Sequence, residues 1–289
     1  MDRPIRIIAE VGTNWGGDKE LLGVAIAQAH SAGATAIKYQ IGLDELYDKQ
    51  RMPNTWQKLQ RYKFPVNELP IIKLLANNCG MELWASVFTL ELLDQCAPYL
   101  DGIKIASGDI VYRPMLARAA YWSKQYNIPL AISTGAASAR EIWNAILAVK
   151  DASRVILMKC TSQYPADSHD ANLAWMTMFE TDVDELGFSD HTCGFITAQL
   201  AVALRYTTFE THFTPKPDSS NPDNIVSFDM EDLHEYVSCI HAAARIVGNG
   251  TWKITEAEEQ ERLWARRAPS GKRPAQGLST DGTTIRNEQ

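Results

Sequence analysis

Residues 186–223 read LGFSDHTCGFITAQLAVALRYTTFETHFTPKPDSSNPD, and this stretch decides the fold that we expect for the chain. Two short runs typical of buried strands, 185–188 and 207–210, enclose a segment with a helical pattern. His191 follows the first run and His212 the second, each with a carboxylate close by. At the same edge of a parallel sheet, two imidazoles can bind one divalent metal from neighbouring strands. The stretch alone leaves open the alternative of two hydrogen-bonded polar residues at strand ends.

The same alternation of strand and helix patterns extends over the rest of the first 250 residues. The other strand candidates are 5–12, 35–40, 82–87, 102–106, 129–133 and 155–159. Helical patterns occupy 18–32, 66–79, 89–97, 113–126, 137–149, 172–179, 194–204 and 229–247. Mostly apolar strands that alternate with helices predict a (β/α)8 barrel, a TIM barrel in the α/β class, whose usual size is about 250 residues. An open doubly wound sheet is the alternative, but no GxGxxG motif follows any of the runs.

Two segments fall outside this alternation. A polar and aromatic excursion over 41–65 follows the second strand, and we expect an active-site loop or flap there. Near the C-terminus, 255–262 is charged, which predicts a helix, and 270–289 is rich in Gly, Ser, Thr and Arg, which predicts a flexible tail. We therefore expect a catalytic barrel over 1–250 and a short C-terminal extension over 251–289.

The bulk composition restricts the class of protein. A net charge of −7 argues against nucleic acid as the main partner, because that binding usually requires a basic face. The five cysteines are scattered without a CxxC motif, which indicates free thiols and a reducing compartment. The N-terminus has no signal-peptide pattern, and no apolar run is long enough to cross a membrane. These features predict a cytoplasmic protein with no membrane partner.

Polar side chains gather at the carboxyl ends of the expected strands, where the active site of such a barrel lies. Lys38 and Lys104 are costly there unless they bind an anion or, as the alternative, only pair with Glu10 or Asp109. Serine hydroxyls, and backbone amides beside glycines, suit phosphate or carboxylate oxygens. The residues alone therefore predict an anionic, phosphorylated substrate beside a two-histidine metal site. The strand-end set is Glu10, Lys38, Gln40, Ser86, Lys104, Ser107, Asp109, Ser133, Ser162, Tyr164, Ser189, His191, Glu210 and His212.

Eight ordered segments carry a resemblance to a known family. They run from Ile7 to Ser227 and read IIAEVGTNWGGD, AIKYQ, GIKIASGD, AISTGAAS, KCTSQYP, GFSDHT, FETHFT and NPDNIVS. The chain resembles the sialic acid synthase family, barrel enzymes that condense phosphoenolpyruvate with an N-acyl amino sugar. The resemblance implies a carbohydrate-biosynthesis transferase that forms a C–C bond and acts as a homodimer.

The resemblance also implies a role for each matching position. His191 and His212 would bind the metal, for which an open site with two imidazoles suits Mn2+ or Mg2+, and Glu10 would lie near the reacting carbons. Phosphoenolpyruvate would be held by Lys38, Ser86, Lys104, Ser107, Ser133, Ser162 and Ser189, of which Ser86 and Ser162 replace other residues common in the family. The acceptor sugar would contact Gln40, Asp109, Tyr164 and Asp223.

Two departures from the family pattern concern the acceptor. Asn14-Trp15-Gly16-Gly17 stands where the family usually has Asn-His-Asn-Gly, and we expect Trp15 at the rim beside the acceptor. Family members also carry a C-terminal antifreeze-like domain that lends an arginine to a partner subunit, and the chain is expected to be too short to contain it. Lys272–Gly277 resembles part of that domain, and Arg273 would be the lent arginine.

The function that we expect is therefore a metal-dependent condensation of phosphoenolpyruvate with an N-acyl hexosamine, giving a sialic-type acid and phosphate by C–O cleavage. One alternative keeps this chemistry and uses a different, non-hexosamine aldehyde as acceptor. The other alternative is a non-catalytic barrel that binds an anion.

Overall fold

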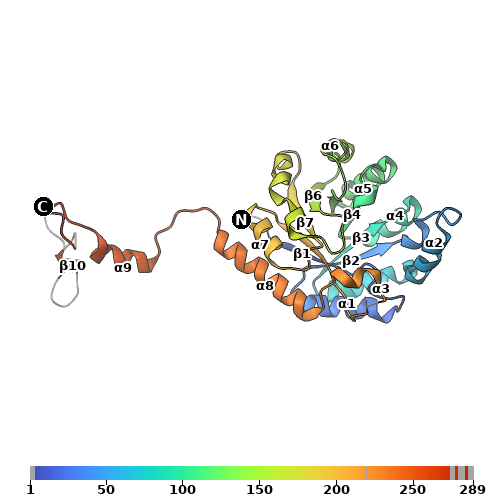
Figure 1. Ribbon diagram of the computed structural model, residues 1–289, viewed down its shortest axis with the longest axis horizontal. Helices are drawn as coiled ribbons and strands as arrows, with labels where there is room; N and C mark the ends of the chain where they lie inside the picture. Colours follow the sequence, from blue (N-terminus) through green and yellow to red (C-terminus); the bar gives the residue numbers. More distant parts are fainter. Residues whose placement is uncertain (1–3, 219, 274–276, 279–283, 286–289) are drawn as a thin grey trace. The chain divides into compact units, whose positions relative to one another are not determined.

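The computed structural model describes residues 4–218, 220–273, 277–278 and 284–285. The chain divides into two compact units, Met1–Val247 and Gly248–Gln289, and each is described by itself. The first unit contains a closed barrel of parallel strands in the order β1 to β8, with the helices around it (Figure 1). This architecture confirms the predicted (β/α)8 barrel.

The elements of the barrel follow the predicted alternation. The strands are β1 Arg6–Glu10, β2 Ala36–Ile41, β3 Glu82–Val87, β4 Gly102–Ile105, β5 Pro129–Ser133, β6 Arg154–Cys160, β7 Glu185–Asp190 and β8 Thr208–His212. The helices are α1 Glu20–Ser31, α2 Pro53–Leu59, α3 Leu69–Asn78, α4 Leu90–Cys96, α5 Arg113–Tyr126, α6 Ala139–Ala148, α7 Ile196–Ala203 and α8 Met230–Val247.

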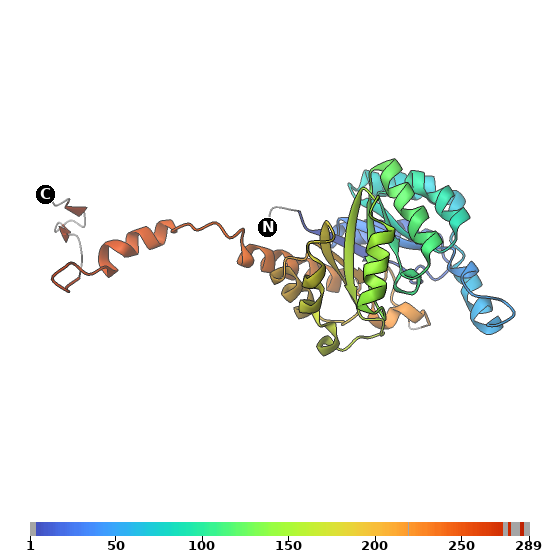
Figure 2. The same ribbon diagram turned by 90° about the horizontal axis from the view of Figure 1, so that it is seen from above.

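The strands read as nearly unbroken apolar runs because both of their faces are covered. One face packs inside the barrel, where Ile8, Trp84 and Met158 belong to a small interior cluster. The other face packs under the helices, which run alongside the strands (Figure 2) and enclose a larger cluster that includes Ile7 and Leu157. Burying apolar area on both faces is the main contribution that holds the barrel together.

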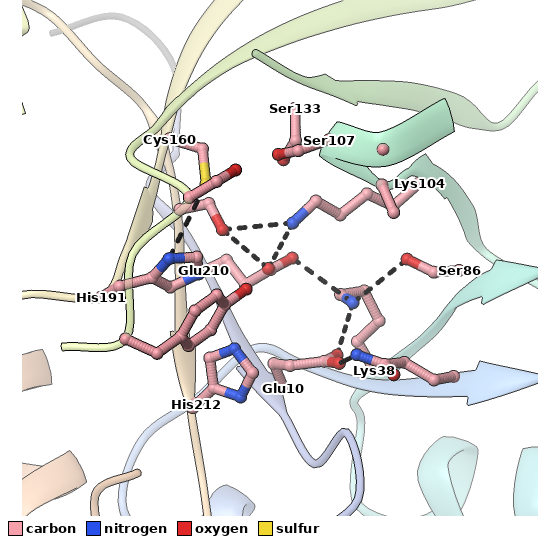
Figure 3. Close-up of a pocket in the computed structure, with 16 residues that line it drawn as sticks. Glu10, Lys38, Ser86, Lys104, Ser107, Ser133, Cys160, His191, Glu210 and His212 are labelled. Atoms are coloured by element: carbon pink, nitrogen blue, oxygen red, sulfur yellow. Dashed lines mark hydrogen bonds and ion pairs between the residues drawn. The ribbon is translucent and has the colours of Figure 1, made fainter. Parts of the chain in front are cut away.

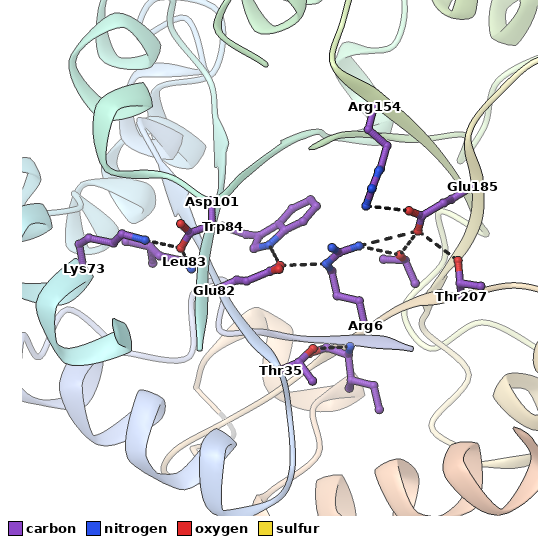
Figure 4. Close-up of polar contacts among 12 residues, drawn as sticks. Arg6, Thr35, Lys73, Glu82, Leu83, Trp84, Asp101, Arg154, Glu185 and Thr207 are labelled. Atoms are coloured by element: carbon purple, nitrogen blue, oxygen red, sulfur yellow. Dashed lines mark hydrogen bonds and ion pairs between the residues drawn. The ribbon is translucent and has the colours of Figure 1, made fainter. Parts of the chain in front are cut away.

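Charged side chains close the amino-terminal end of the barrel (Figure 4). Arg6 donates from Nε to Glu82 at 2.8 Å, and the same carboxylate accepts from the indole of Trp84 at 2.8 Å. The guanidinium of Arg6 lies 5.4 Å from the Trp84 ring centroid and 3.7 Å from Glu185, which also pairs with Arg154 at 3.3 Å. These contacts satisfy buried polar groups far from the strand ends that carry the predicted site.

Gly102→Ala is expected to lower the free energy of unfolding by roughly 1–3 kcal/mol, because it overpacks the barrel interior. Gly102 lies directly beside Trp84 in the β3–β4 register, and a Cβ there would overlap the indole ring. Gly23→Ala is the matched control, because its Cβ would only touch Leu75 at 3.4 Å and alanine favours a helix. Urea unfolding measures both variants, and equal stability of Gly102→Ala and the parent chain would contradict this packing.

Two connecting segments differ from the sequence-based expectation. The excursion over 41–65 is not only a loop, because it contains α2 and two short 3-10 turns. The segment 173–179 forms a 3-10 helix where a helical pattern was predicted. Leu173, Met176 and Phe179 are spaced by three residues and all are buried, which matches the three-residue turn of a 3-10 helix.

In the second unit, helix α9 spans Glu256–Ala265, as the charged pattern predicts. Thr255 caps it, and Glu258 completes a capping box. Within the predicted flexible tail, Gly277–Leu278 pairs with Thr284–Ile285 as two antiparallel strands, β9 and β10, while 274–276, 279–283 and 286–289 lie outside the described residues. Across the described ranges of the whole chain, no helix combines the length and apolar content that a membrane crossing requires.

Candidate active site

The strand register brings the predicted residues together at the carboxyl end of the barrel. Glu10 on β1 is the direct neighbour of Lys38 on β2 and of His212 on β8, and Ser189 on β7 is that of Glu210 on β8. These residues line one pocket (Figure 3), together with others from all eight strand ends. The pocket is lined by Glu10, Lys38, Gln40, Ser86, Lys104, Ala106, Ser107, Gly108, Ser133, Cys160, Ser162, Tyr164, Ser189, His191, Glu210 and His212.

Three predicted acceptor residues do not line this pocket. Asp109 lies in the 3-10 turn after β4 and is half-buried. Asp223 binds the loop after β1, where its Oδ2 accepts hydrogen bonds from the backbone N and the hydroxyl of Thr13 at 2.8 and 2.9 Å. Arg273 is exposed in the second unit. The acceptor roles of these three residues stay predictions.

Both buried lysines pair with carboxylates in the pocket. Lys38 Nζ lies 2.5 Å from Glu10 Oε2 and 3.7 Å from Glu210 Oε2. Lys104 pairs closely with Glu210 Oε1 and lies 3.2 Å from the hydroxyl of Ser189, which in turn donates to Glu210 at 3.0 Å. The sequence predicted Glu10 or Asp109 as the carboxylate partners of these lysines. Glu10 does pair with Lys38, but the partner of Lys104 is Glu210 and not Asp109.

Glu210 is the functional residue that the sequence reasoning left without a role. It was visible as a polar strand end, and the two-residue period of a strand places Thr208, Glu210 and His212 on one face of β8. The pairing of Glu210 with both lysines was not visible, because Lys38 on β2 and Lys104 on β4 are more than 100 residues away in the sequence. Glu210 as a whole is only 2% exposed, so its charge depends on these pairs.

The two pocket carboxylates differ in proton affinity. Burial raises the pKa of Glu10, and the ammonium of Lys38 offsets only part of that rise. Burial acts on Glu210 in the same direction, but Lys104 and Lys38 outweigh it and lower the pKa of Glu210 to about 2. Glu210 therefore stays ionised and balances the lysines, while Glu10 is the carboxyl better suited to take up and release a proton.

The two histidines lie side by side, with ring centroids 5.3 Å apart. The Nδ1 of His191 lies 2.9 Å from the carbonyl oxygen of Thr161. Because a carbonyl only accepts, Nδ1 must carry the proton, which leaves the Nε2 lone pair free to bind a ligand. Tyr164 stacks on the His191 ring at 4.2 Å. His191 thus has the backbone partner that metal-binding imidazoles commonly have.

These histidines fit a divalent metal. The buried Nδ1 of His212 has no hydrogen-bond partner among the described residues, so a ring nitrogen is available there too. Within the described ranges no cluster of three or more His, Cys, Asp or Glu side chains could hold an ion. Two protein nitrogens leave open positions for water and substrate oxygens, which suits Mn2+ or Mg2+ in a catalytic rather than a structural site.

His212→Gln is expected to flatten the pH dependence of stability in the metal-free protein. Burial lowers the pKa of His212 to about 4, so between pH 6.5 and 4 the unfolded chain binds more protons than the folded one. Stability then falls as the pH falls through this window, by on the order of 3 kcal/mol at 1.36 kcal/mol per pKa unit. Urea unfolding in the presence of a chelator measures this, and exposed His30→Gln is the control. An unchanged pH dependence in His212→Gln would contradict the burial of a neutral imidazole.

A cradle of hydroxyls lies beside Lys104. Ser107 Oγ accepts a hydrogen bond from the backbone N of Gly135 at 3.2 Å. A Cβ at Gly135 would overlap Ser162 Oγ and lie 2.7 Å from Ser107 Oγ, so only glycine lets both hydroxyls approach. Ser133 Oγ is buried without a partner among the described residues. Hydroxyl donors beside a buried ammonium suit the oxygens of a phosphate or a carboxylate.

The expectation for Trp15 was wrong. Its side chain is 2% exposed and packs in the core, with its ring edge toward Phe64 at 6.4 Å. The indole buries more apolar area under the excursion than at a solvated rim, which explains its position. In the loop after β1, Thr13 instead donates a hydrogen bond to Asp223. Gly12 lies so close to Asp223 that a Cβ at position 12 would overlap its carboxylate.

Comparison with known proteins identifies the family. The model of the NeuB family matches residues 25–252. The chain belongs to the NeuB family. This finding confirms the predicted resemblance, because curated relatives of this NeuB chain are named as synthases of sialic-type acids.

Two relatives and two solved structures describe the similarity. An N,N'-diacetyllegionaminic acid synthase from Legionella pneumophila is 31% identical over 91% of this chain and 78% of its own length. A pseudaminic acid synthase from Campylobacter jejuni is 28% identical over 92% of this chain and 81% of its own length. An N-acetylneuraminic acid (sialic acid) synthetase from Leptospira borgpetersenii, solved with citrate, has a TM-score of 0.80 and 28% identity, covering 90% of both chains. A truncated 3-deoxy-D-arabino-heptulosonate 7-phosphate synthase from Thermotoga maritima, 14% identical over 85% of this chain and 88% of its own, shares the fold with a TM-score of 0.66.

Proposed function

We propose that this NeuB-family protein condenses phosphoenolpyruvate with the aldehyde of an N-acyl hexosamine, giving a nonulosonic acid and phosphate. The observation that carries the proposal is the enclosure of Lys38 and Lys104 in one pocket with a hydroxyl cradle and two histidines. Phosphoenolpyruvate bears a phosphate and a carboxylate close together, which match the two ammonium groups. The relatives named as legionaminic and pseudaminic acid synthases support the class of product.

Two groups of pocket residues are suited to bind the two anionic groups of phosphoenolpyruvate. Lys104, Ser107 and Ser162 are suited to one anionic group of phosphoenolpyruvate, and Lys38 with Ser86, 3.3 Å apart, to the other. Because Glu10 and Glu210 hold both lysines in place beforehand, the ammonium groups need little reorganisation when the anion arrives. Pre-positioned charges in a buried site stabilise the developing charges of the reaction better than water does.

The reaction balances without a redox partner. Carbon 3 of phosphoenolpyruvate attacks the aldehyde carbon, and the aldehyde oxygen gains a proton and becomes a hydroxyl. Carbon 2 becomes cationic, water adds to it, and that water loses a proton. The hydroxyl on carbon 2 then gives up its proton as the C–O bond to phosphate breaks, leaving a 2-oxo acid and phosphate, which takes up that proton. Glu10 is suited to accept the proton from water, and ionised Glu210 to stabilise the cationic carbon.

His191 and His212 would hold the divalent metal, Mn2+ or Mg2+. When bound, the ion supplies Lewis-acid polarisation of the aldehyde oxygen. Tyr164 lies against both histidines, stacked on His191 and edge-on to His212 at 5.7 Å, so it covers both rings and shields them from water. Its hydroxyl, on a side chain that borders the pocket, is placed to contact the acceptor.

An isotope experiment tests this function. Phosphoenolpyruvate labelled with 18O in the bridging position is incubated with N-acetylmannosamine and Mn2+, and released phosphate is analysed by mass spectrometry. We expect the label in phosphate, and we expect release to require both the aldehyde and the metal and to stop when a chelator is added. Label retained in the organic product, or release that is independent of the aldehyde, would contradict the proposal.

The acceptor class is the finer part of the proposal. The non-hexosamine alternative rested on Trp15 at the rim and on the expected lack of the antifreeze-like domain, and the burial of Trp15 removes the first of these reasons. A non-catalytic barrel that binds an anion could use the two buried lysines but not the unpartnered imidazole nitrogen of His212, because an unused buried polar group destabilises the fold. The homodimer and the cytoplasmic location stay predictions, which sedimentation and localisation of the tagged chain can check.

A further inference from the structure

Lys159 is a buried lysine that the proposed function does not use. It lies on β6 between Met158, which packs inside the barrel, and Cys160, which lines the pocket. Because side chains alternate along a strand, Lys159 points out of the barrel, away from the pocket. It is nevertheless only 8% exposed. A lysine in such a position needs an explanation, because burying an ammonium is costly.

The ammonium of Lys159 binds neutral oxygen atoms. It donates to the carbonyl oxygen of Cys160 at 3.0 Å and to the hydroxyl of Thr161 at 3.2 Å. No carboxylate forms an ion pair with it in the part of the chain that the structure describes, and burial lowers the pKa of Lys159. Its contacts therefore hold the backbone turn after β6 rather than neutralise an acid.

The two residues that Lys159 holds are the two that contact Nδ1 of His191. The Thr161 carbonyl oxygen lies 2.9 Å from this nitrogen, and Cys160 Sγ lies 3.8 Å from it. The Thr161 hydroxyl donates onward to the carbonyl of Asp170 at 3.1 Å, so the turn is tied on its outer side as well. A continuous chain of contacts thus runs from Lys159 through the turn to the imidazole.

The same segment holds His191 in two further ways. The backbone N of Ala166 donates to the His191 carbonyl at 2.8 Å, and the Tyr164 ring stacks on the imidazole. The backbone and the ring face are therefore set by other residues, whereas the proton on Nδ1 is held by the Thr161 carbonyl at 2.9 Å, with Cys160 Sγ farther away at 3.8 Å. Loss of the Thr161 contact would release the ring to place a proton on Nε2, which then could not bind a metal.

We propose that Lys159 is a positioning residue that fixes the turn after β6, and thereby the tautomer of His191 that binds the divalent metal. The inference rests on the proposed function for the metal itself, but the link from Lys159 to the tautomer does not need turnover. Lys159 touches neither substrate nor metal and acts only through Thr161 and Cys160.

Lys159→Met tests the proposal, because it keeps the length of the side chain and removes the ammonium. The full chain is labelled with 15N-histidine, and long-range proton–nitrogen spectra are recorded without metal at alkaline pH, where the imidazole is neutral. We expect the Nδ1–H form of His191 in the parent chain and a mixture with the Nε2–H form in the variant. Mn2+ binding, measured by calorimetry without substrate, should weaken about 10- to 100-fold.

Two further variants keep the test decisive. Thr161→Val removes the hydroxyl that Lys159 binds, and it should reproduce the effect, with the double variant no worse than either single one. Lys73→Met is the control, because it makes the same change at a half-buried lysine that pairs with Asp101 at the opposite end of the barrel (Figure 4). It should lower stability but leave Mn2+ binding unchanged.

The proposal fails if Lys159→Met and Thr161→Val both keep the Nδ1–H form and bind Mn2+ within twofold of the parent chain. If Lys159→Met does not fold, Thr161→Val alone decides. Failure of the proposed function is separate, because it would appear as absent phosphate release in the parent chain, whatever the tautomer of His191.

Discussion

Lys104→Met is expected to abolish phosphate release from phosphoenolpyruvate, with a loss of about 1,000-fold or more. The variant loses the ammonium beside the hydroxyl cradle, so an anionic group arriving there meets ionised Glu210 without its partner. It should also lower the free energy of unfolding by on the order of 3 kcal/mol, at the low end for a broken buried pair, because Lys38 remains 3.7 Å from Glu210. A phosphate assay and urea unfolding measure the two effects.

The double variant Lys104→Met/Glu210→Gln separates the two effects. Removing the unpaired carboxylate should recover most of the lost stability, because no isolated charge is then left in the pocket. Activity should stay lost, because the ammonium is still missing. Full activity in Lys104→Met would refute its role in binding the anion, and a double variant as unstable as Lys104→Met would refute the pairing with Glu210.

His191→Ala and His212→Ala are each expected to lose metal-dependent phosphate release and tight Mn2+ binding. Each variant removes one of the two imidazoles that would hold the ion, and no cluster of three or more potential ligands exists within the described ranges to replace it. Exposed His234→Ala on α8 is the matched control and should behave as the parent chain does. Calorimetry with Mn2+ and the phosphate assay measure the effects.

Retention of full activity in both histidine variants would overturn the metal assignment. A variant that binds Mn2+ normally but lacks activity would show instead that the imidazole acts on the substrate. Because the two rings lie 5.3 Å apart and share contacts with Tyr164, their effects should not be additive.

The barrel was predictable because its strands carry their own signature. Segments such as Arg154–Cys160, RVILMKC, are apolar on both faces until the last residues, and the polar change marks the strand end that faces the pocket. Parallel strands in a closed barrel end at the same edge, so strand-end positions such as Glu10, Lys38 and His212 could be assigned to one site without coordinates.

Other features depended on contacts that a sequence does not state. Glu210 was recognised as a polar strand-end residue. Its pairing with Lys104 spans the barrel, from β8 to β4, and depends on the tilt of the strands and the closure of the barrel. Lys159 looked like any strand-end residue, and only its outward direction and its turn contacts separate it from the pocket lysines. Trp15 was placed at the rim because it stands where the family usually has a histidine, whereas its ring packs against Phe64, which comes from a distant excursion.

The central claim is that one pocket joins phosphoenolpyruvate to an aldehyde sugar. It is tested most directly by mass spectrometry of the product formed by the metal-loaded protein from phosphoenolpyruvate and a panel of aldehydes, with phosphate measured in parallel. We predict a product whose mass equals acceptor plus phosphoenolpyruvate plus water minus phosphoric acid, formed with N-acyl hexosamines, with one phosphate released for each product molecule. The absence of such a product and of phosphate release with every aldehyde in the panel, from protein shown to bind Mn2+, would contradict the account.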